Sequence, residues 1–167
     1  WMKSLGRPRF TRAGEFLGYA GCTIDIHDAK LAEVQLALLA AVVNSSQDAI
    51  YSFTLDTTMI SWNRAAENLF GWTEVEVLGR KWSEFHSPEA AQELEQIVAH
   101  VGSGEPVTRF ESKRQRKNGT IFDVSLTFSP VVAQDKIAAI SVVARDVTER
   151  KQAEEYREQQ ARLLELS

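Results

Sequence analysis

The feature that most constrains the fold is a run of alternating apolar and polar residues that follows a turn signal. From Phe122 to Phe128, every second residue is apolar and the residues between them are polar. A period of two is typical of a β-strand that buries one face. Lys117-Asn118-Gly119 comes just before this run, and an Asn-Gly pair favours a tight hairpin. Residues 107–116 and 121–132 are therefore predicted to be adjacent antiparallel strands.

Similar patterns predict five strands in all, at residues 51–55, 59–62, 107–116, 121–132 and 137–146. Three short helices are expected between the second strand and the third. Asn63 is placed to cap the first helix, and Thr73 and Glu76 form a capping box for the second. Ser87-Pro88 is a typical start for the third. This order predicts an α+β fold, with a five-stranded antiparallel sheet and short helices on one face.

Amphipathic helices are predicted on both sides of this unit. Residues 27–44 carry apolar side chains at heptad-like spacing, and part of the helix is apolar all round. Such a helix must pack against its own domain or against a second chain. We expect a dimer interface at Leu31, Val34, Leu38, Ala41 and Val42. Residues 150–167 predict a more polar helix with a weaker coiled-coil pattern.

A short internal repeat connects the two ends of the chain. Residues 23–33 align with residues 144–154, because in both copies an apolar strand ends at Asp-Ile or Asp-Val and a charged helix begins. The same offset aligns a turn at Gly14 with a turn at Asp135. Residues 1–26 are therefore predicted to be the last strand pair of a preceding domain of the same kind.

Five motifs follow one another along the chain, at residues 61–67 (SWNRAAE), 69–73 (LFGWT), 76–80 (EVLGR), 116–119 (RKNG) and 144–151 (ARDVTERK). In this order and spacing they resemble the landmarks of a PAS sensory domain, and the last is similar to the Asp-Ile-Thr motif that joins such domains to a signalling helix. The chain departs from the usual pattern at two turns that lack glycine, at residues 56–58 and 134–136.

The resemblance implies the tail of a preceding PAS domain at residues 1–26, a linker helix at 27–44, a PAS domain at 45–149 and a signalling helix at 150–167. It further implies a bacterial multi-domain sensor, such as a histidine kinase or a cyclic-dinucleotide enzyme. The chain itself is not expected to be an enzyme, because it has neither a catalytic constellation nor a phosphate-binding glycine loop. Kinase or cyclase activity would belong to a downstream domain.

No cofactor is predicted. Light-sensing flavin relatives need a cysteine in the core helices, whereas Cys22, the only cysteine, lies in the leading strand pair. Haem-binding relatives supply a histidine from the long helix, and the position of this chain that lies closest to that histidine is Glu95. His86 and His100 flank that helix and are interpreted as surface histidines. Three scattered histidines and one cysteine do not favour a metal site.

Strand and helix periodicity predict which residues would line an interior ligand pocket. The candidates are Phe53, Leu55, Leu94, Ile97, Val98, Arg114, Val124, Leu126, Ile140, Val142 and Ala144. Nearly all are apolar, so a filled core without a ligand is favoured over a small apolar ligand. Arg114 has the same strand parity as Phe110 and Ser112. It would bind an anionic group if it faced inward, although a solvent-facing Arg114 is the favoured interpretation.

The functional hypothesis is a homodimeric relay. A change in the core would move the last strand, and Asp146 and Thr148 would fix how the outgoing helix leaves the sheet. The expected partners are a second copy and the neighbouring PAS and output domains. The competing hypothesis is a passive dimerisation spacer that senses nothing.

Charge and hydropathy exclude some partners. With 19 Lys and Arg against 23 Asp and Glu, the net charge of −4 does not favour nucleic acid. The basic run at residues 113–117 is interpreted as a solvated turn. The longest apolar run, residues 36–43, is far shorter than the roughly 20 residues of a membrane span. These features predict a soluble, cytoplasmic module.

Overall fold

The computed structural model describes residues 1–165, and the chain divides into two compact units, Trp1–Val42 and a second that begins at Val43. The first unit contains a hairpin of β1 (Met2–Phe10) and β2 (Phe16–Asp25). It is followed by α1 (His27–Ser45), whose last residues belong to the second unit. The helix predicted at residues 27–44 is therefore present.

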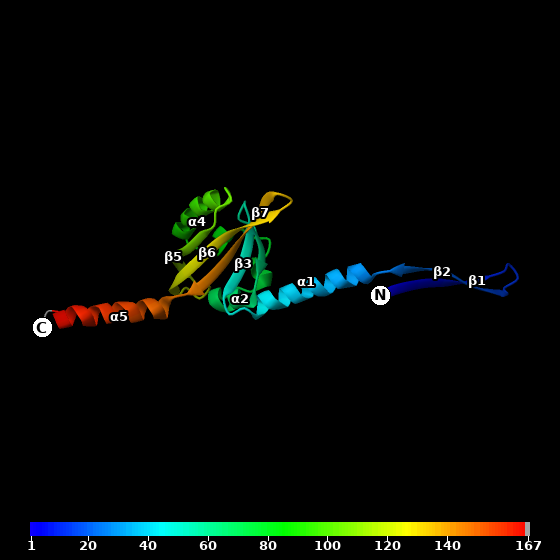
Figure 1. Ribbon diagram of the computed structural model, residues 1–167, viewed down its shortest axis with the longest axis horizontal. Coiled ribbons are helices and arrows are strands. Elements are labelled where there is room, and N and C mark those ends of the chain that lie inside the picture. Colours follow the sequence, from blue (N-terminus) through cyan, green and yellow to red (C-terminus); the bar gives the residue numbers. More distant parts are fainter. Residues whose placement is uncertain (166–167) are drawn as a thin grey trace. The chain divides into compact units, whose positions relative to one another are not determined.

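The second unit is built on an antiparallel sheet (Figure 1). Within the described residues this sheet has five strands in the order β4-β3-β7-β6-β5. The strands are β3 (Ala49–Thr54), β4 (Met59–Trp62), β5 (Val107–Gln115), β6 (Ile121–Ala133) and β7 (Lys136–Asp146). The predicted fold class is confirmed. The long strands β6 and β7 pair along almost their whole length and contribute most of the sheet.

Short helices connect β4 to β5 and cover one face of the sheet. They are α2 (Arg64–Phe70), α3 (Glu74–Val77), the 3₁₀ turn η1 (Trp82–Glu84) and α4 (Pro88–Val101). Asn63 caps α2 by accepting a hydrogen bond from the Ala66 amide at 2.8 Å, and Thr73 and Glu76 form the expected capping box. Figure 1 shows the last helix, α5 (Thr148–Glu165), leaving the sheet at the end of β7.

The core lies between the sheet and these helices. Phe53, Val124, Leu126, Ile140 and Val142 have no exposed surface. From the helix side, α4 contributes the buried residues Leu94, Ile97 and Val101, with Val98 half-buried at the edge. The predicted alternation is thus correct for the long strands, because burying every second side chain is what fixes their register.

Leu55 is an exception, since its side chain is 42% exposed and the prediction that it faces inward is wrong. β3 ends at Thr54, and Leu55 and Asp56 form a turn, so the alternation no longer applies to them. The turn contains Thr57 at a φ of 67°, a left-handed conformation that a β-branched residue rarely adopts. The turn between β6 and β7, which also lacks glycine, contains two further residues with a positive φ, Gln134 at 50° and Asp135 at 60°.

Candidate functional site

Arg114 lies inside the domain rather than on its surface. Its residue is 3% exposed, so the favoured interpretation of a solvent-facing side chain is wrong. In β5, Arg114 pairs with Phe122 of β6, which is also buried, and the register therefore turns both side chains toward the core. The sequence did not indicate the inward orientation of Arg114, because four cations in the five residues 113–117 are typical of a solvated turn.

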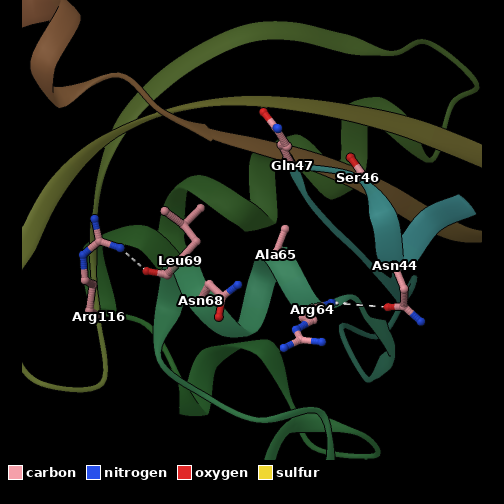
Figure 2. A pocket seen from close by; sticks show the side chains of 8 residues that line it. All are labelled: Asn44, Ser46, Gln47, Arg64, Ala65, Asn68, Leu69 and Arg116. Atoms are coloured by element: carbon pink, nitrogen blue, oxygen red, sulfur yellow. Dashed lines mark hydrogen bonds between the residues drawn. The ribbon is translucent and has the colours of Figure 1, made fainter. Parts of the chain in front are cut away.

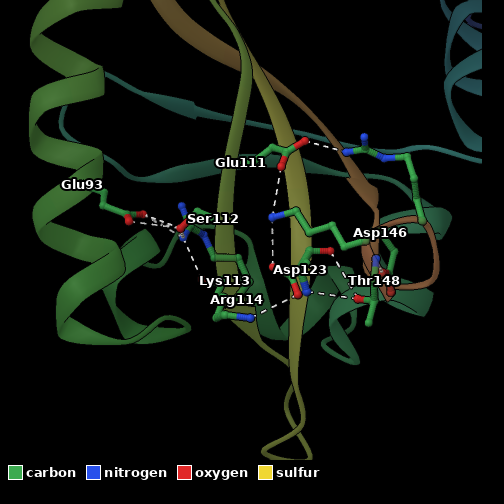
Figure 3. Close-up of polar contacts among 10 residues, drawn as sticks. Glu93, Glu111, Ser112, Lys113, Arg114, Asp123, Asp146 and Thr148 are labelled. Atoms are coloured by element: carbon green, nitrogen blue, oxygen red, sulfur yellow. Dashed lines mark hydrogen bonds and ion pairs between the residues drawn. The ribbon is translucent and has the colours of Figure 1, made fainter. Parts of the chain in front are cut away.

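One edge of the Arg114 guanidinium is fully used by the protein. Its Nη1 donates to Glu93 Oε2 of α4 at 2.9 Å, to Ser112 Oγ at 2.6 Å and to the Lys113 carbonyl at 2.9 Å. The Ser112 hydroxyl also donates to the Glu93 carboxylate. Figure 3 shows this group bridging α4 and β5. The ion pair satisfies the charge of a cation that would otherwise be costly to bury.

Arg114 also lies close to a group of aromatic residues. Its Cζ lies 5.6 Å from the centroid of the Trp82 ring, and the centroid of the His86 ring lies 3.6 Å from that of Trp82. Burial raises the pKa of the Tyr51 hydroxyl to about 12, against the opposing effects of the Arg114 charge and of a hydrogen bond with the Trp82 indole. Tyr51, Trp82, His86 and Arg114 thus form one buried polar cluster, which we call the interior cluster.

His86 differs from its predicted role as a surface histidine. Its Nδ1 is buried, and burial together with the Arg114 charge holds the pKa of the imidazole well below its usual value. Trp82 begins η1 and His86 lies two residues after its end, and the two rings meet at an interplanar angle of 43°. His86 also lines a surface hollow of about 230 Å³ together with Trp72, Phe85 and Gln115.

A second polar group lies where β7 passes into α5. The Thr148 amide donates to Asp146 Oδ1 at 2.9 Å, and the Asp123 amide of β6 donates to Thr148 Oγ1 at 3.1 Å. Arg116 Nη2 reaches Asp146 Oδ2 at 2.6 Å. Partial burial of Asp146 opposes its ionisation, but the Thr148 hydrogen bonds and Arg116 outweigh burial and lower the pKa of its carboxyl group. Figure 3 shows Asp146 and Thr148 beside Asp123.

The first turn of α5 is also tied to the sheet. Lys151 Nζ lies 3.0 Å from Glu111 Oε2 and 3.2 Å from Asp123 Oδ1, and Arg150 Nη2 lies 2.6 Å from Glu111 Oε1. Hydrogen bonds from Lys151 and Arg150 lower the pKa of the Glu111 carboxyl group. We call the set Glu111, Asp123, Asp146, Thr148, Arg150 and Lys151 the exit junction. Both predicted relay residues belong to it.

The family described as the PAS fold matches residues 43–152, more than half of the chain. The chain belongs to the PAS family. No protein of curated function matches it. Solved structures agree on the fold: the PAS domain of an HTR-like protein from Haloarcula marismortui is 23% identical with a TM-score of 0.64, covering 73% of this chain and 99% of its own.

Two further similar structures come from larger signalling proteins. A domain of a sensory box sensor histidine kinase/response regulator from Geobacter sulfurreducens is 22% identical, with a TM-score of 0.57, and covers 69% of this chain and 96% of its own. An RNA-binding light-oxygen-voltage receptor is 21% identical, with a TM-score of 0.65. It covers 99% of this chain, which in turn spans 44% of that receptor.

The structure brings most of the predicted pocket residues of the PAS domain to one face. Phe53, Leu94, Ile97, Arg114, Val124, Leu126, Ile140, Val142 and Ala144 are buried, Val98 is half-buried and Leu55 lies outside. Tyr51, Trp82 and His86 complete the polar part of this interior, and none of them is among the predicted pocket residues. Tyr51 has the same strand parity as Phe53, which is the sequence signal for its inward orientation. The 3₁₀ turn that contains Trp82 and the bend that contains His86 have no clear periodicity.

A larger hollow of about 500 Å³ lies beside the start of the PAS domain, lined in part by Asn44, Gln47, Arg64 and Arg116 (Figure 2). Asn44 Oδ1 accepts a hydrogen bond from the Arg64 amide at 3.3 Å, and Arg116 donates to the Leu69 carbonyl. The hollow is open and polar. Its lining does not include the predicted pocket residues.

The cations of the basic run at residues 113–117 are all paired with acids. Lys113 contacts Asp123, Arg114 contacts Glu93, Arg116 contacts Asp146 and Lys117 contacts Glu76. The interpretation as a solvated turn is therefore wrong for Arg114 and Arg116, which fold back onto the domain. Since each positive charge has an acidic neighbour, the run does not form a free cationic surface.

Other residues singled out by the sequence have simpler surroundings. Cys22 is exposed in β2, in the first unit. Among residues 1–165, no three His, Cys, Asp or Glu side chains gather closely enough to hold a metal ion. None of the described helices is both long and apolar enough to cross a membrane. On α1, Leu31, Val34 and Leu38 are exposed, at 50%, 61% and 64%.

Proposed function

We propose that this PAS domain senses a change in its interior and relays it through the exit junction to α5, as the sensory and dimerisation module of a multi-domain sensor with a histidine kinase output. The observation that carries the proposal is the exit junction itself. Its hydrogen bonds and ion pairs attach the first turn of α5 to three strands of the sheet, through Glu111 of β5, Asp123 of β6 and Asp146 of β7.

The junction is mechanically connected to the interior cluster through β5. Arg114 faces the core, and Glu111, three residues earlier on the same strand, holds Arg150 and Lys151 of α5. Lys113 lies between them and pairs with Asp123, its register partner on β6. A displacement of β5 caused at Arg114 would therefore move the anchor points of α5. Packed strands and ion pairs of this kind are one way in which two sites in a protein are coupled.

The relay can be tested in a fusion protein. The chain is joined to the catalytic half of a histidine kinase so that α5 continues as one helix into the kinase. A core change, Val142→Ala, should alter the autophosphorylation rate by about fivefold or more. In the background of Asp146→Ala with Thr148→Ala, the same core change should have little effect, while near-ultraviolet circular dichroism still shows a packed core. Gln159→Ala, further along α5, is the matched control. An equal response in both backgrounds would refute the relay.

Dimerisation is proposed through the heptad-like stripe of α1. Leu31, Val34, Leu38 and Ala41 recur at the spacing of a coiled-coil seam, and burying their exposed surfaces in a second copy would be favourable. Sedimentation should show a dimer for the whole chain and a monomer for Leu38→Glu. Leu36→Glu, an equally exposed leucine on another face of the same helix, should remain dimeric. Identical behaviour of the two variants would refute this interface.

A passive dimerisation spacer is the alternative, and the tight core favours it. Phe53, Val124, Leu126, Ile140 and Val142 are fully buried, so the apolar part of the interior is well filled. A spacer would dimerise through α1 and would leave kinase activity unchanged by any core substitution that preserves folding. The fusion experiment above therefore separates the two functions.

A further inference from the structure

The interior cluster contains polar atoms that the protein does not satisfy. Among the residues that the structure describes, His86 Nδ1, Arg114 Nε and Arg114 Nη2 are buried without a hydrogen-bond partner, and Tyr51 Oη and Trp82 Nε1 have no partner other than each other. These five atoms come from four side chains that are neighbours in the core, as their ring contacts and mutual charge effects show. Leaving so many buried polar atoms unpaired is costly, and native domains rarely do so.

The chemistry of these atoms is strongly biased toward donation. The Trp82 indole and both Arg114 nitrogens can only donate hydrogen bonds, and the Tyr51 hydroxyl can donate as well. Nε and Nη2 form one edge of the guanidinium and point two N–H groups in parallel, which is the geometry that a carboxylate accepts in a bidentate manner. Nη1 is engaged by Glu93 and Ser112, so the Nε–Nη2 edge is the part of the guanidinium that remains unpaired.

We propose that the interior cluster binds a small monocarboxylate, whose two oxygens accept from the Nε–Nη2 edge of Arg114 and from Trp82 and Tyr51. This inference rests on the proposed sensory function, and it names the class of ligand that would act there. Arg114 is the one buried cation among the described residues, so a second carboxylate on the ligand would have no partner. The rings of Phe53 and Phe70, whose centroids lie 6.5 and 5.8 Å from that of Tyr51, pack against the cluster and limit the ligand to a few atoms.

His86 places the cluster close to the surface. The centroid of its ring lies 3.6 Å from that of Trp82, with the rings tilted by 43°, and His86 also lines the hollow of about 230 Å³. A ligand would enter past this side chain. For a ligand of a few non-hydrogen atoms we expect a Kd of about 0.1–10 mM.

The test is a titration of the whole chain with acetate and propionate, followed by ¹H–¹⁵N spectra of the Arg114 Nε–H and Trp82 indole N–H resonances. Both resonances should shift in parallel and saturate, because both groups donate to the ligand. Acetamide, which has the same shape without the charge, and succinate, which has a second carboxylate, should produce no saturating shift. The absence of a shift at about 50 mM acetate would overturn the proposal.

Substitutions test the role of Arg114. Arg114→Lys keeps the charge but loses the bidentate edge, and should weaken acetate binding by about tenfold or more. Glu95→Gln, which removes an exposed carboxylate from α4, should leave binding within about threefold of the wild type. If Arg114→Lys fails to fold, Tyr51→Phe, which keeps the ring, should weaken binding several-fold. Equal affinity in Tyr51→Phe and Glu95→Gln, or an equal response to chloride, would refute a built carboxylate site.

The same samples distinguish this inference from the relay. Asp146→Ala with Thr148→Ala should bind acetate as the wild type does, because neither residue belongs to the interior cluster. Binding without a change in the amide resonances of α5 would support the carboxylate site and refute the relay. A core substitution that moves α5 without any acetate binding would support the relay and refute the carboxylate site.

Discussion

Arg116 and Asp146 form an ion pair in which Nη2 lies 2.6 Å from Oδ2, although they are thirty positions apart in the sequence. The pair lies where β7 ends and α5 begins. The same guanidinium donates to the Leu69 carbonyl of α2 and lies 4.1 Å from the centroid of the Phe122 ring. Arg116 therefore connects a helix, a strand and the exit junction, and it is the side chain that joins the helical layer to the outgoing helix.

Arg116→Met should lower the free energy of unfolding by about 1–2 kcal/mol, because it removes a charged hydrogen bond to a carbonyl and a partly exposed ion pair. Urea denaturation followed by tryptophan fluorescence measures this. Arg64→Met, on the exposed face of α2, should change stability by less than about 0.5 kcal/mol. A similar loss in the two variants would mean that the contacts of Arg116 contribute nothing specific.

Two leucines give a direct comparison of buried and exposed positions. Leu126 is fully buried in β6, so Leu126→Ala should cost about 2–5 kcal/mol through lost burial and a cavity. Leu55 lies in the turn after β3, 42% exposed, and Leu55→Ala should cost less than about 1 kcal/mol. Thermal and urea denaturation of both variants measure the difference. A loss of stability in Leu55→Ala as large as that in Leu126→Ala would show that Leu55 faces inward, as strand periodicity predicts.

The turn between β6 and β7 holds two residues in a conformation that favours Asn and Gly. Gln134 and Asp135 both have positive φ, as in a type I′ hairpin turn, and both are exposed. Gln134→Asn with Asp135→Gly should therefore raise the free energy of unfolding by about 0.5–1 kcal/mol. Gly119, at a φ of 89° in the other hairpin, supplies the opposite control.

Gly119→Ala should destabilise the domain by about 1 kcal/mol, because alanine is strained at a positive φ. Both effects appear as shifts of the urea midpoint with an unchanged slope. Destabilisation by the Asn-Gly pair would show that the side chains of the native turn make compensating contacts.

The exit junction should weaken only in acid. Asp146 has a folded-state pKa below its ordinary value of 3.8, so its stabilising effect is complete at neutral pH and is lost as the pH falls through the folded-state pKa. Amide exchange in the first turn of α5 should be constant from about pH 7 to 5, after correction for intrinsic rates, and should increase below about pH 4. In Asp146→Asn the exchange should be faster at neutral pH and its acid step should be smaller, with the remainder due to Glu111 and Asp123, whose pKa values are also lowered.

His86 should give a separate pH dependence at higher pH. Its folded-state pKa lies well below the ordinary 6.5, so the unfolded chain binds a proton first as the pH falls. Stability should be constant above about pH 6.5 and should decrease below it, in a range where the carboxyl groups are still ionised. His86→Gln should remove this decrease, as measured by urea denaturation at several pH values. A persistent slope in His86→Gln would assign it to another group.

Local sequence patterns accounted for most of the fold. Asp146 and Thr148 were predicted through the resemblance of residues 144–151 to a PAS motif. Alternation in β6 predicted its buried face, and Asn63 and the Thr73–Glu76 capping box marked helix starts. These features depend on interactions between residues close in sequence, or on a period that any half-buried strand must keep. For this reason they can be recognised in one chain alone.

Tertiary structure decided what happens where segments distant in sequence meet. Arg114 belongs to a basic run that reads as solvated, yet β5 pairs with β6 in a register that turns it inward, and Glu93, 21 positions away, makes its burial tolerable. The association of Trp82 and His86 with it depends on a 3₁₀ turn and the bend after it, which carry no periodic signal. The sequence by itself determined the strands, caps and outgoing helix, because local backbone preferences and side-chain periodicity act within each segment. Only packing between segments placed the unpaired donors next to one another, because a side chain's surroundings depend on partners that its own segment does not contain.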